Sequence, residues 1–190
     1  MKSTMLKVSN LAFEFPDRKL LKNLSFVVKP GYAIHVTGAN GAGKTTLLRL
    51  LAGLLIPADG NIAFKGGATY LSHQYGVNLF LTPFEHLRFD LNATDEEAEE
   101  LLQKFNLERV ANKPLGLLSD GQKRRVSLMQ LIYSEHEVWL LDEPLVGLDA
   151  KGMALLGEII QSHLKQEGLV VFTSHQALPF PLPQVETINL

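Results

Sequence analysis

Cysteine is absent from the 190-residue sequence, which excludes disulfides, cysteine-based zinc sites and covalent haem attachment. Charge of one sign is not in excess either. The 18 Lys and Arg residues face 20 Asp and Glu residues, and a net charge of -2 leaves no electrostatic footprint for nucleic acid. Long hydrophobic runs are also missing, since the longest, Leu47 to Ile56, is interrupted by Arg49 and is far shorter than the ~20 residues that span a bilayer. The first residues, Met1 to Lys7, lack the apolar stretch of a secretion signal. These absences predict one soluble domain on the cytoplasmic side, with no nucleic-acid partner and no transmembrane segment of its own.

One glycine-rich stretch matches the pattern G-x-x-x-x-G-K-[ST] of a phosphate-binding loop. Its residues are Gly38, Ala39, Asn40, Gly41, Ala42, Gly43, Lys44, Thr45 and Thr46. A strand is predicted before it, over Ala33 to Thr37, and a helix after it, over Lys44 to Leu54. The buried face of that helix is expected to consist of Leu47, Leu48, Leu50 and Leu51. The glycines let successive N–H groups point at phosphates, Lys44 can reach the β- and γ-phosphates, and the Thr45 hydroxyl can ligate Mg²⁺. A glycine-rich turn that matched by chance would lack this strand and helix, so the stretch predicts nucleotide binding.

Two strands are predicted ahead of this loop, over Leu6 to Phe15 and Leu24 to Val28, with a turn at Pro16 to Arg18. This order argues against a simple nucleotide kinase, in which the phosphate-binding loop comes almost first. Phe13 and Phe15 fall on the same face of the first strand because strand side chains alternate. Either both are core residues, or one of them stacks on adenine, and Phe15 is the better candidate because it adjoins the turn.

The segment from Val77 to Leu117 departs from the alternation of strands and helices and is predicted to be an all-helical insert. Thr94 and Glu97 have the spacing of a capping box, which starts a helix that runs to about Phe105. The acidic run from Asp95 to Glu100 complements the helix dipole and is a poor candidate for a metal site. The other elements expected between the phosphate-binding loop and Thr94 are a turn at Pro57 to Gly60, strands at Asn61 to Phe64 and Ala68 to Leu71, and a short helix at Pro83 to Phe89.

The residues Leu118 to Gln122 spell Leu-Ser-Asp-Gly-Gln and lead into a further helix. Ser119 and Gln122 have capping-box spacing, so the simplest interpretation is a well-capped helix. The same Ser119 hydroxyl, the Gly121 amide and the helix N-terminus also suit a phosphate. The basic triplet Lys123 to Arg125 is predicted to be a solvated helix face rather than a nucleic-acid patch.

Two carboxylates end the apolar strand that begins at Val138. In a protein with a phosphate-binding loop, Asp142 is predicted to hold the Mg²⁺ shell and Glu143 to polarise the attacking water. His175 follows the last predicted strand, and at the carboxyl end of the same sheet it is well placed to contact the γ-phosphate. The remaining expected elements are a helix from Lys151 to about Gln166 with Asp149 as its N-cap, and a strand from Gly168 to Phe172.

The order of these motifs resembles the nucleotide-binding domain of an ABC transporter, from about Leu6 to the end of the chain. The resemblance implies an α/β fold, a P-loop NTPase of the ABC ATPase type. It implies a mixed sheet core, an N-terminal antiparallel β part and an inserted helical subdomain. The single domain, 1–190, then divides into a nucleotide-binding core, 1–75 and 118–190, and a helical subdomain, 76–117.

The resemblance also assigns roles by position, with ATP and Mg²⁺ as the ligands. Gln74 corresponds to the glutamine that touches Mg²⁺ and relays to the membrane subunit. Glu143 corresponds to the catalytic glutamate, and His175 to the switch histidine.

Ser119, Gly121 and Gln122 correspond to the signature that contacts ATP bound to the other protomer. This implies a head-to-tail dimer that encloses two ATP molecules, so one chain supplies half of each site. Asp120 stands where Gly is common, and its carboxylate must point away from the γ-phosphate because like charges repel. Phe15 stands where Tyr is more usual, which costs little because stacking uses the ring face.

Four stretches are similar to the haem exporter ATPase of cytochrome c maturation: Tyr70–Gly76, Leu81–Phe89, Gly121–Val126 and Ser174–Gln176. Met129 and Gln130 stand where that group usually has Ala and Arg. The similarity implies multispanning membrane subunits as partners and a peripheral position on the cytoplasmic face of the inner membrane. ATP turnover would then drive haem export or the release of a haem-loaded chaperone.

Three alternatives stay open from the sequence. The chain could serve another small exporter, which only its membrane partner would distinguish. Non-transport ABC ATPases of DNA repair or translation usually carry a long coiled coil or two nucleotide domains, and this sequence has neither. A small-molecule kinase would leave the Leu118–Gln122 signature without a role.

Overall fold

The computed structural model describes residues 5–74 and 76–190, so Met1 to Thr4 and Tyr75, the latter within one of the stretches of resemblance, lie outside the described residues. The strands are β1 (Leu6–Phe15), β2 (Arg18–Val28), β3 (Ala33–Thr37), β4 (Asp59–Ala63), β5 (Ala68–Leu71), β6 (Val138–Leu141), β7 (Leu169–Thr173) and β8 (Val185–Asn189). The α-helices are α1 (Lys44–Leu51), α2 (Pro83–Glu85), α3 (Asp95–Lys104), α4 (Asp120–Ile132) and α5 (Ala150–Lys165). A π-helix covers His86–Asp90, and 3-10 turns cover Glu108–Val110 and Leu115–Leu117.

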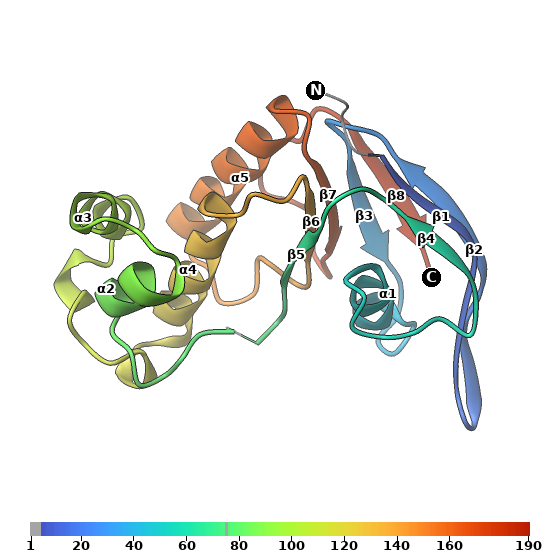
Figure 1. Cartoon of the computed structure of the whole chain (residues 1–190), viewed down its shortest axis with the longest axis horizontal. Helices are drawn as coiled ribbons and strands as arrows, with labels where there is room; N and C mark the ends of the chain where they lie inside the picture. The colour runs from blue at the N-terminus through green and yellow to red at the C-terminus, as the bar shows by residue number, and fades with distance from the viewer. Residues whose placement is uncertain (1–4, 75) are drawn as a thin grey trace.

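A five-stranded parallel sheet in the order β5-β6-β7-β3-β8 forms the centre of the described chain (Figure 1). All of β6 and β7 is buried, because helices cover both faces of a parallel sheet. The alternation of strand side chains divides β7 between two cores. Leu169 and Val171 point into the core with α1, and Val170 and Phe172 point into the core with α4 and α5.

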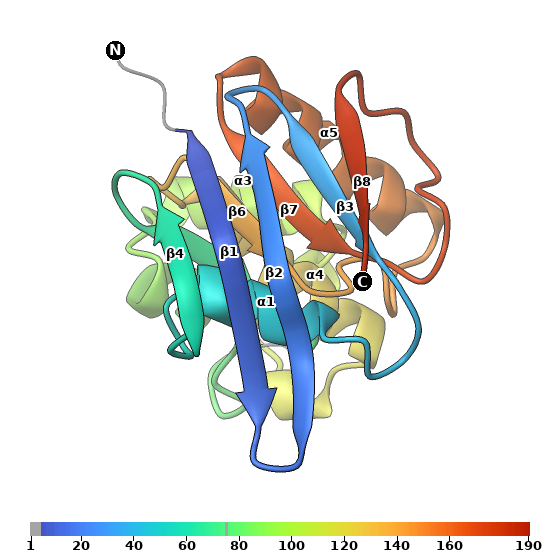
Figure 2. The same cartoon turned by 90° about the vertical axis from the view of Figure 1, so that its right-hand side faces the viewer.

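A second sheet, antiparallel and in the order β2-β1-β4, lies across α1 from the parallel sheet (Figures 1 and 2). The predicted apolar face of α1 joins residues of both sheets in one core: Leu47, Leu48, Leu50 and Leu51. The expected α/β architecture with an antiparallel N-terminal part is observed, although parallel and antiparallel strands lie in separate sheets rather than in one mixed sheet.

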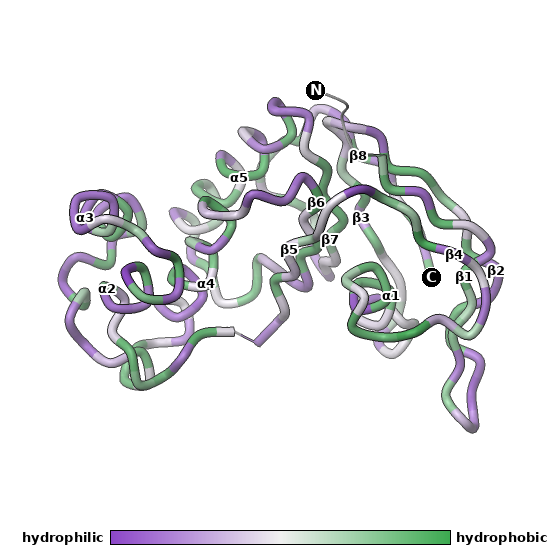
Figure 3. Tube along the Cα trace, viewed as in Figure 1, coloured by the Kyte–Doolittle hydropathy of each residue, from purple (hydrophilic) through white to green (hydrophobic). Residues whose placement is uncertain are grey.

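The helical segment between β5 and α4 lies beyond α4, at the end of the molecule farthest from the antiparallel sheet (Figure 1). The predicted capping box of α3 is present, because Thr94 accepts from the Glu97 N–H while the Glu97 carboxylate accepts from the Thr94 N–H. α3 turns Ala98 and Leu102 into the core and is otherwise mostly hydrophilic (Figure 3). Among the described helices, none combines the length and apolarity that crossing a bilayer requires.

Several boundaries differ from the sequence-based expectation. β2 begins at Arg18 rather than Leu24, because the Pro16–Asp17 turn places Arg18 directly opposite Phe15 and the ladder continues from there. α1 ends at Leu51 rather than Leu54, since Gly53 adopts a positive φ of 72°. β4 starts within the expected turn, at Asp59.

One further predicted element is a helix with a different hydrogen-bond pattern, and one element was not predicted. The expected helix over Pro83–Phe89 is a short α-turn that passes into the π-helix His86–Asp90. β8 was missed altogether, because it is an exposed edge strand that pairs only with β3 and lacks an apolar alternation.

Candidate ATP-hydrolysis site

The phosphate-binding loop connects β3 to α1 and depends on three glycines in left-handed conformations. The φ angles of Gly38, Gly41 and Gly43 are 140°, 77° and 111°, which residues with a Cβ rarely adopt. The Lys44 side chain is only 8 % exposed, and its Nζ donates to the carbonyls of Gly38 at 2.8 Å and Ala39 at 3.1 Å. These bonds fix the loop and hold the ammonium beside the turn where phosphates bind.

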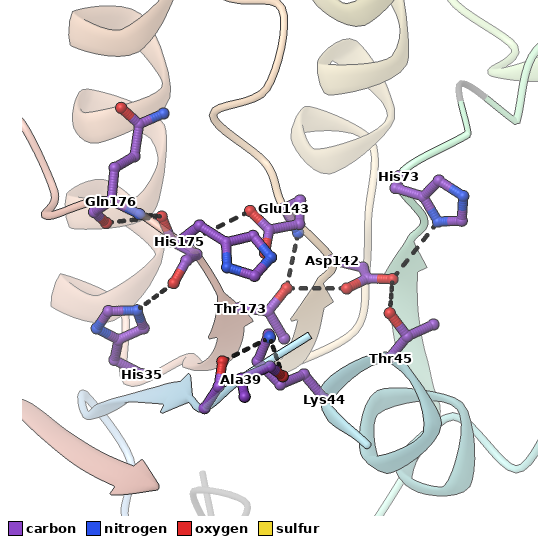
Figure 4. A network of polar contacts seen from close by, with 12 residues as sticks. His35, Ala39, Lys44, Thr45, His73, Asp142, Glu143, Thr173, His175 and Gln176 are labelled. Carbon is purple, nitrogen blue, oxygen red and sulfur yellow. Dashed lines mark hydrogen bonds and ion pairs between the residues drawn. The ribbon is translucent and has the colours of Figure 1, made fainter. Parts of the chain in front are cut away.

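Asp142 follows β6 and lies beside side chains of α1, β7 and the loop after β5 (Figure 4). Its carboxylate is 1 % exposed; Oδ2 accepts from the Thr45 hydroxyl at 2.8 Å and Oδ1 accepts from the Thr173 hydroxyl at 2.8 Å. His73 Nδ1 lies 3.7 Å from Oδ2. A carboxylate and a hydroxyl are the hard oxygen donors that Mg²⁺ takes from a protein when phosphates and water complete its shell. The described residues contain no cluster of three or more acidic, His or Cys ligands.

Glu143 carries both backbone strain and an unpaired acceptor. Its φ of 49° is left-handed, which costs energy for a residue with a side chain and is found at functional sites. Oε2 accepts from the His175 N–H at 3.4 Å. Oε1 is buried without a hydrogen bond; it lies 3.3 Å from His175 Nε2, but not in hydrogen-bond geometry. The Glu143 side chain as a whole is 16 % exposed and borders the cleft described next, so the carboxylate can meet a water there.

These groups surround one cleft of about 380 Å³, within the range of about 300–1,000 Å³ usual for small-molecule sites. Its lining consists of Phe15, Arg18, Leu20, Asn40, Gly41, Gly43, Lys44, Thr45, Thr46, Asp142, Glu143 and His175. Phe15 is 51 % exposed at the far wall, whereas Phe13 supports it edge-on with ring centroids 5.3 Å apart. Only Phe15 of this pair therefore faces the cleft.

The signature residues do not line this cleft; they form the start of α4. Ser119 Oγ accepts from the Gln122 N–H at 3.3 Å, and Gln122 Oε1 accepts from the Ser119 N–H at 2.9 Å, so the predicted capping box is present. A Cβ on Gly121 would lie 2.7 Å from the Gly147 carbonyl, which explains why α4 needs glycine here. The Asp120 carboxylate is 77 % exposed and lies 3.7 Å from the Lys123 ammonium.

Gln74 lies just beyond β5 and is exposed, and its side chain does not line the cleft. Its carbonyl accepts from the Ser72 hydroxyl at 2.7 Å, which shapes the loop. The neighbouring His73 is the residue of this loop that approaches Asp142.

The expectation for the basic triplet was wrong. Arg124 is 1 % exposed, and Lys123 and Arg125 are also largely covered. Arg125 forms an ion pair of 2.6 Å with Asp149, whose other carboxylate oxygen caps α5 as predicted. The capping N–H of Gly152 and the Arg125 guanidinium lower the pKa of Asp149.

Sequence reasoning missed Leu20, which lines the cleft, and three polar residues of the site. Thr173 is the last residue of a strand whose other residues are apolar. Its hydroxyl at the end of that strand was the feature of the sequence that could have indicated a site residue. Arg18 donates to the Gly41 carbonyl at 3.2 Å, but at the tip of a hairpin it resembled an ordinary turn residue. His73 carried no signal apart from the adjacent Gln74.

The fold and the cleft together define an ATPase with a phosphate-binding loop, and comparisons identify its family. The ABC transporter family profile matches residues 21–146. The cytochrome c biogenesis ATP-binding export protein CcmA of Legionella pneumophila is 41 % identical over 98 % of this chain and 100 % of its own length. The corresponding proteins of Vibrio vulnificus strain YJ016 and Hyphomonas neptunium are 37 % and 38 % identical over 98 % and 97 % of this chain, and over 99 % and 96 % of their own lengths.

Solved structures agree. The structure of an ABC transporter ATP-binding protein of Pyrococcus furiosus aligns with 96 % of this chain and with 96 % of its own, with a TM-score of 0.81. The sequence identity is 24 %, so this likeness bears on the fold alone. The ATP-binding subunit of another ABC transporter covers 90 % of this chain and 80 % of its own, with a TM-score of 0.76 at 26 % identity. The chain therefore belongs to the ABC transporter ATPase family, in the group of the cytochrome c biogenesis ATP-binding export proteins. As a member of this family it binds and hydrolyses ATP, and it works with membrane subunits.

Proposed function

We propose that this chain is the ATP-hydrolysing subunit of a transporter in cytochrome c biogenesis, where ATP turnover drives haem export or the release of a haem-loaded chaperone. The observation that carries this proposal is the meeting of Lys44, Asp142 and Glu143 in one cleft of a chain that aligns along nearly its whole length with the cytochrome c biogenesis export proteins.

In this proposal, the adenine of ATP stacks on Phe15 and the phosphates follow the glycine-rich loop. Lys44 exchanges its loop carbonyls for the β- and γ-phosphates. The Glu143 carboxylate, whose Oε1 lies next to His175, accepts a hydrogen bond from the attacking water and orients it toward the γ-phosphate. His175, 3.3 Å from that carboxylate oxygen, contacts the γ-phosphate through Nε2.

We infer that Asp142 and the Thr45 hydroxyl hold Mg²⁺, which supplies positive charge to the phosphates during transfer. The exposed Gln74 side chain would also contact this Mg²⁺, and its loop would relay nucleotide binding to the membrane subunit. The helical segment, 76–117, acts as a subdomain of the single domain 1–190, and 1–75 with 118–190 is the nucleotide-binding core.

A second copy of the chain completes each site. Ser119, Gly121 and Gln122 lie outside the cleft of their own chain, yet they present a hydroxyl, an amide and a helix N-terminus that suit phosphate. We expect Glu143→Gln to bind ATP with turnover nearly abolished and to elute as a dimer in its presence. Replacing Ser119 and Gln122 with Ala should abolish that dimer, and an unchanged dimer would overturn this assignment.

We further infer multispanning partners and a peripheral position on the cytoplasmic face of the inner membrane. To test this, tagged Glu143→Gln is expressed in its own host, membranes are solubilised with ATP present, and the proteins that co-purify are identified. Lys44→Ala, which should bind ATP poorly, is the matched control. Multispanning cytochrome c maturation subunits support the proposal. A different permease would overturn the haem assignment, and no membrane protein at all would overturn the transport role.

A further inference from the structure

Arg124 is among the largest fully buried side chains of the described chain, with 1 % exposure. Its guanidinium donates to four main-chain carbonyls. Nη1 reaches Ser72 at 2.8 Å, Nη2 reaches Asp142 at 3.2 Å and Glu143 at 2.9 Å, and Nε reaches Pro144 at 3.4 Å. These carbonyls belong to the loop after β5 and to the loop after β6. One side chain of α4 therefore joins the loop after β6, which lines the nucleotide cleft, to the loop after β5, whose His73 approaches Asp142.

A buried guanidinium is costly unless its donors are satisfied, so a position that serves only packing favours an apolar residue. Here the planar group offers its donors in a fixed fork to four main-chain carbonyls, and the carbonyl of Glu143 also accepts from the Val146 N–H at 3.2 Å. The arrangement therefore indicates a role in holding the shape of the two loops.

The backbone of Glu143 is fixed on both sides. Its N–H donates to the Thr173 hydroxyl at 2.8 Å, and its carbonyl accepts from Arg124 at 2.9 Å. The same Thr173 hydroxyl donates to Asp142 Oδ1 at 2.8 Å, so its orientation is determined by these two bonds. Such bonds can maintain the left-handed φ of 49° at Glu143, which would relax if they were removed.

We propose that Arg124 and Thr173 are positioning residues that hold Glu143 in its strained, water-orienting geometry and make that geometry depend on the placement of α4. The inference rests on the proposed catalytic role of Glu143. Because Arg124 lies two residues after Gln122, a shift of the signature end of α4 moves the Glu143 carbonyl and the Ser72 carbonyl together. Engagement of the signature is thereby coupled to the alignment of the catalytic carboxylate.

The test compares kcat, KM and nucleotide affinity of the full-length chain, purified and in membranes with its transporter partners. Arg124→Gln should lower kcat about a hundredfold, as expected for a small misplacement of a reacting group. Thr173→Val, which has the same shape without the hydroxyl, should lower kcat about tenfold, near the effect of one net hydrogen bond. Thr173→Ser should restore the wild-type rate. The Kd for ATP, measured in chelator without Mg²⁺, should stay within about twofold in all three, because the phosphate-binding loop is untouched.

Two control variants distinguish positioning from general destabilisation. Leu6→Ala removes a fully buried side chain at the far end of β1 and should lower the melting temperature without changing kcat at a temperature where the variant is folded. Arg109→Gln removes the charge of an exposed arginine and should change neither quantity. A loss of kcat in Leu6→Ala as large as that in Arg124→Gln would overturn the inference.

Glu143→Gln, assayed alone and combined with Arg124→Gln, separates this inference from the proposed function. The inference predicts that Arg124→Gln adds no further loss in the Glu143→Gln background, because both changes act on one group. If Glu143→Gln turns over normally, the proposed catalytic role is wrong and the inference falls with it. If Glu143→Gln is inactive while Arg124→Gln and Thr173→Val retain full kcat, only the positioning role is refuted.

Discussion

Replacing Lys44 with Met would remove the ammonium that links the start of α1 to the start of the phosphate-binding loop, while retaining most of the buried stem. Two charge-assisted hydrogen bonds, to the carbonyls of Gly38 and Ala39, would be lost. Each such bond contributes about 1.5–3 kcal/mol, but water from the cleft can hydrate the freed carbonyls, and removing a buried charge lowers a desolvation cost. We therefore expect the free energy of unfolding to fall by about 1–2 kcal/mol even without nucleotide.

For a chain of this size, that loss corresponds to a decrease in melting temperature of about 2–8 °C. ATP adds a second difference. At a concentration of about 100 times Kd, a ligand stabilises the wild-type fold by about 2.7 kcal/mol, and Lys44→Met should lose most of that stabilisation. Urea unfolding and thermal scans, each with and without ATP, measure both the stability of the nucleotide-free protein and the stabilisation by ATP. Lys44→Arg, which keeps the charge, is the control for the nucleotide-free term.

The reasoning is refuted if Lys44→Met melts at or above the wild-type temperature without nucleotide. It is also refuted if ATP raises the melting temperature of the variant as much as that of the wild type. The first result would mean that the loop bonds contribute nothing to stability, and the second that the ammonium is not used in binding.

Three further predictions follow from the described contacts. Phe15→Ala should weaken ATP binding about tenfold in calorimetry while Phe15→Tyr retains it, since base stacking contributes about 1–3 kcal/mol; equal affinities would exclude stacking. Asp142→Asn should lose the gain in nucleotide affinity that Mg²⁺ gives the wild type, measured against chelator, and a retained gain would place the ion elsewhere. Burial lowers the pKa of His163 from 6.5, so the unfolded chain binds its proton first and stability falls as the pH drops through about 6.5. In His163→Gln, urea midpoints at about pH 5.5 and 7.5 should differ less than in the wild type.

The sequence alone was sufficient for the strand–loop–helix unit, the three capped helices and the acidic pair after β6. Each of these depends on residues that are close together in the chain, where spacing limits geometry directly. Ser119 and Gln122 illustrate this, because their separation by three residues determines the capping box before any tertiary contact forms.

The failures have a common physical cause. Arg124 was expected in solvent because its neighbours are basic, whereas its burial depends on carbonyls that lie far away in the chain, on the loops after β5 and β6. β8 gains its hydrogen bonds from β3, more than a hundred residues earlier, and its own composition is that of an exposed edge. Thr173 became part of the site only when the parallel register placed it beside Asp142.

The wall that carries Phe15 and the loop that carries Lys44 belong to different sheets, and the antiparallel hairpin projects past the parallel sheet (Figure 2). A nucleotide with its base on Phe15 of the antiparallel sheet and its phosphates on the loop after β3 of the parallel sheet would therefore bridge the two sheets. ATP binding should reduce the motion of the β1–β2 hairpin, and amide exchange near Arg18 should then be slower than in the protein without nucleotide. ATP binding would then change the motion of the chain at the edge of the molecule farthest from the helical segment.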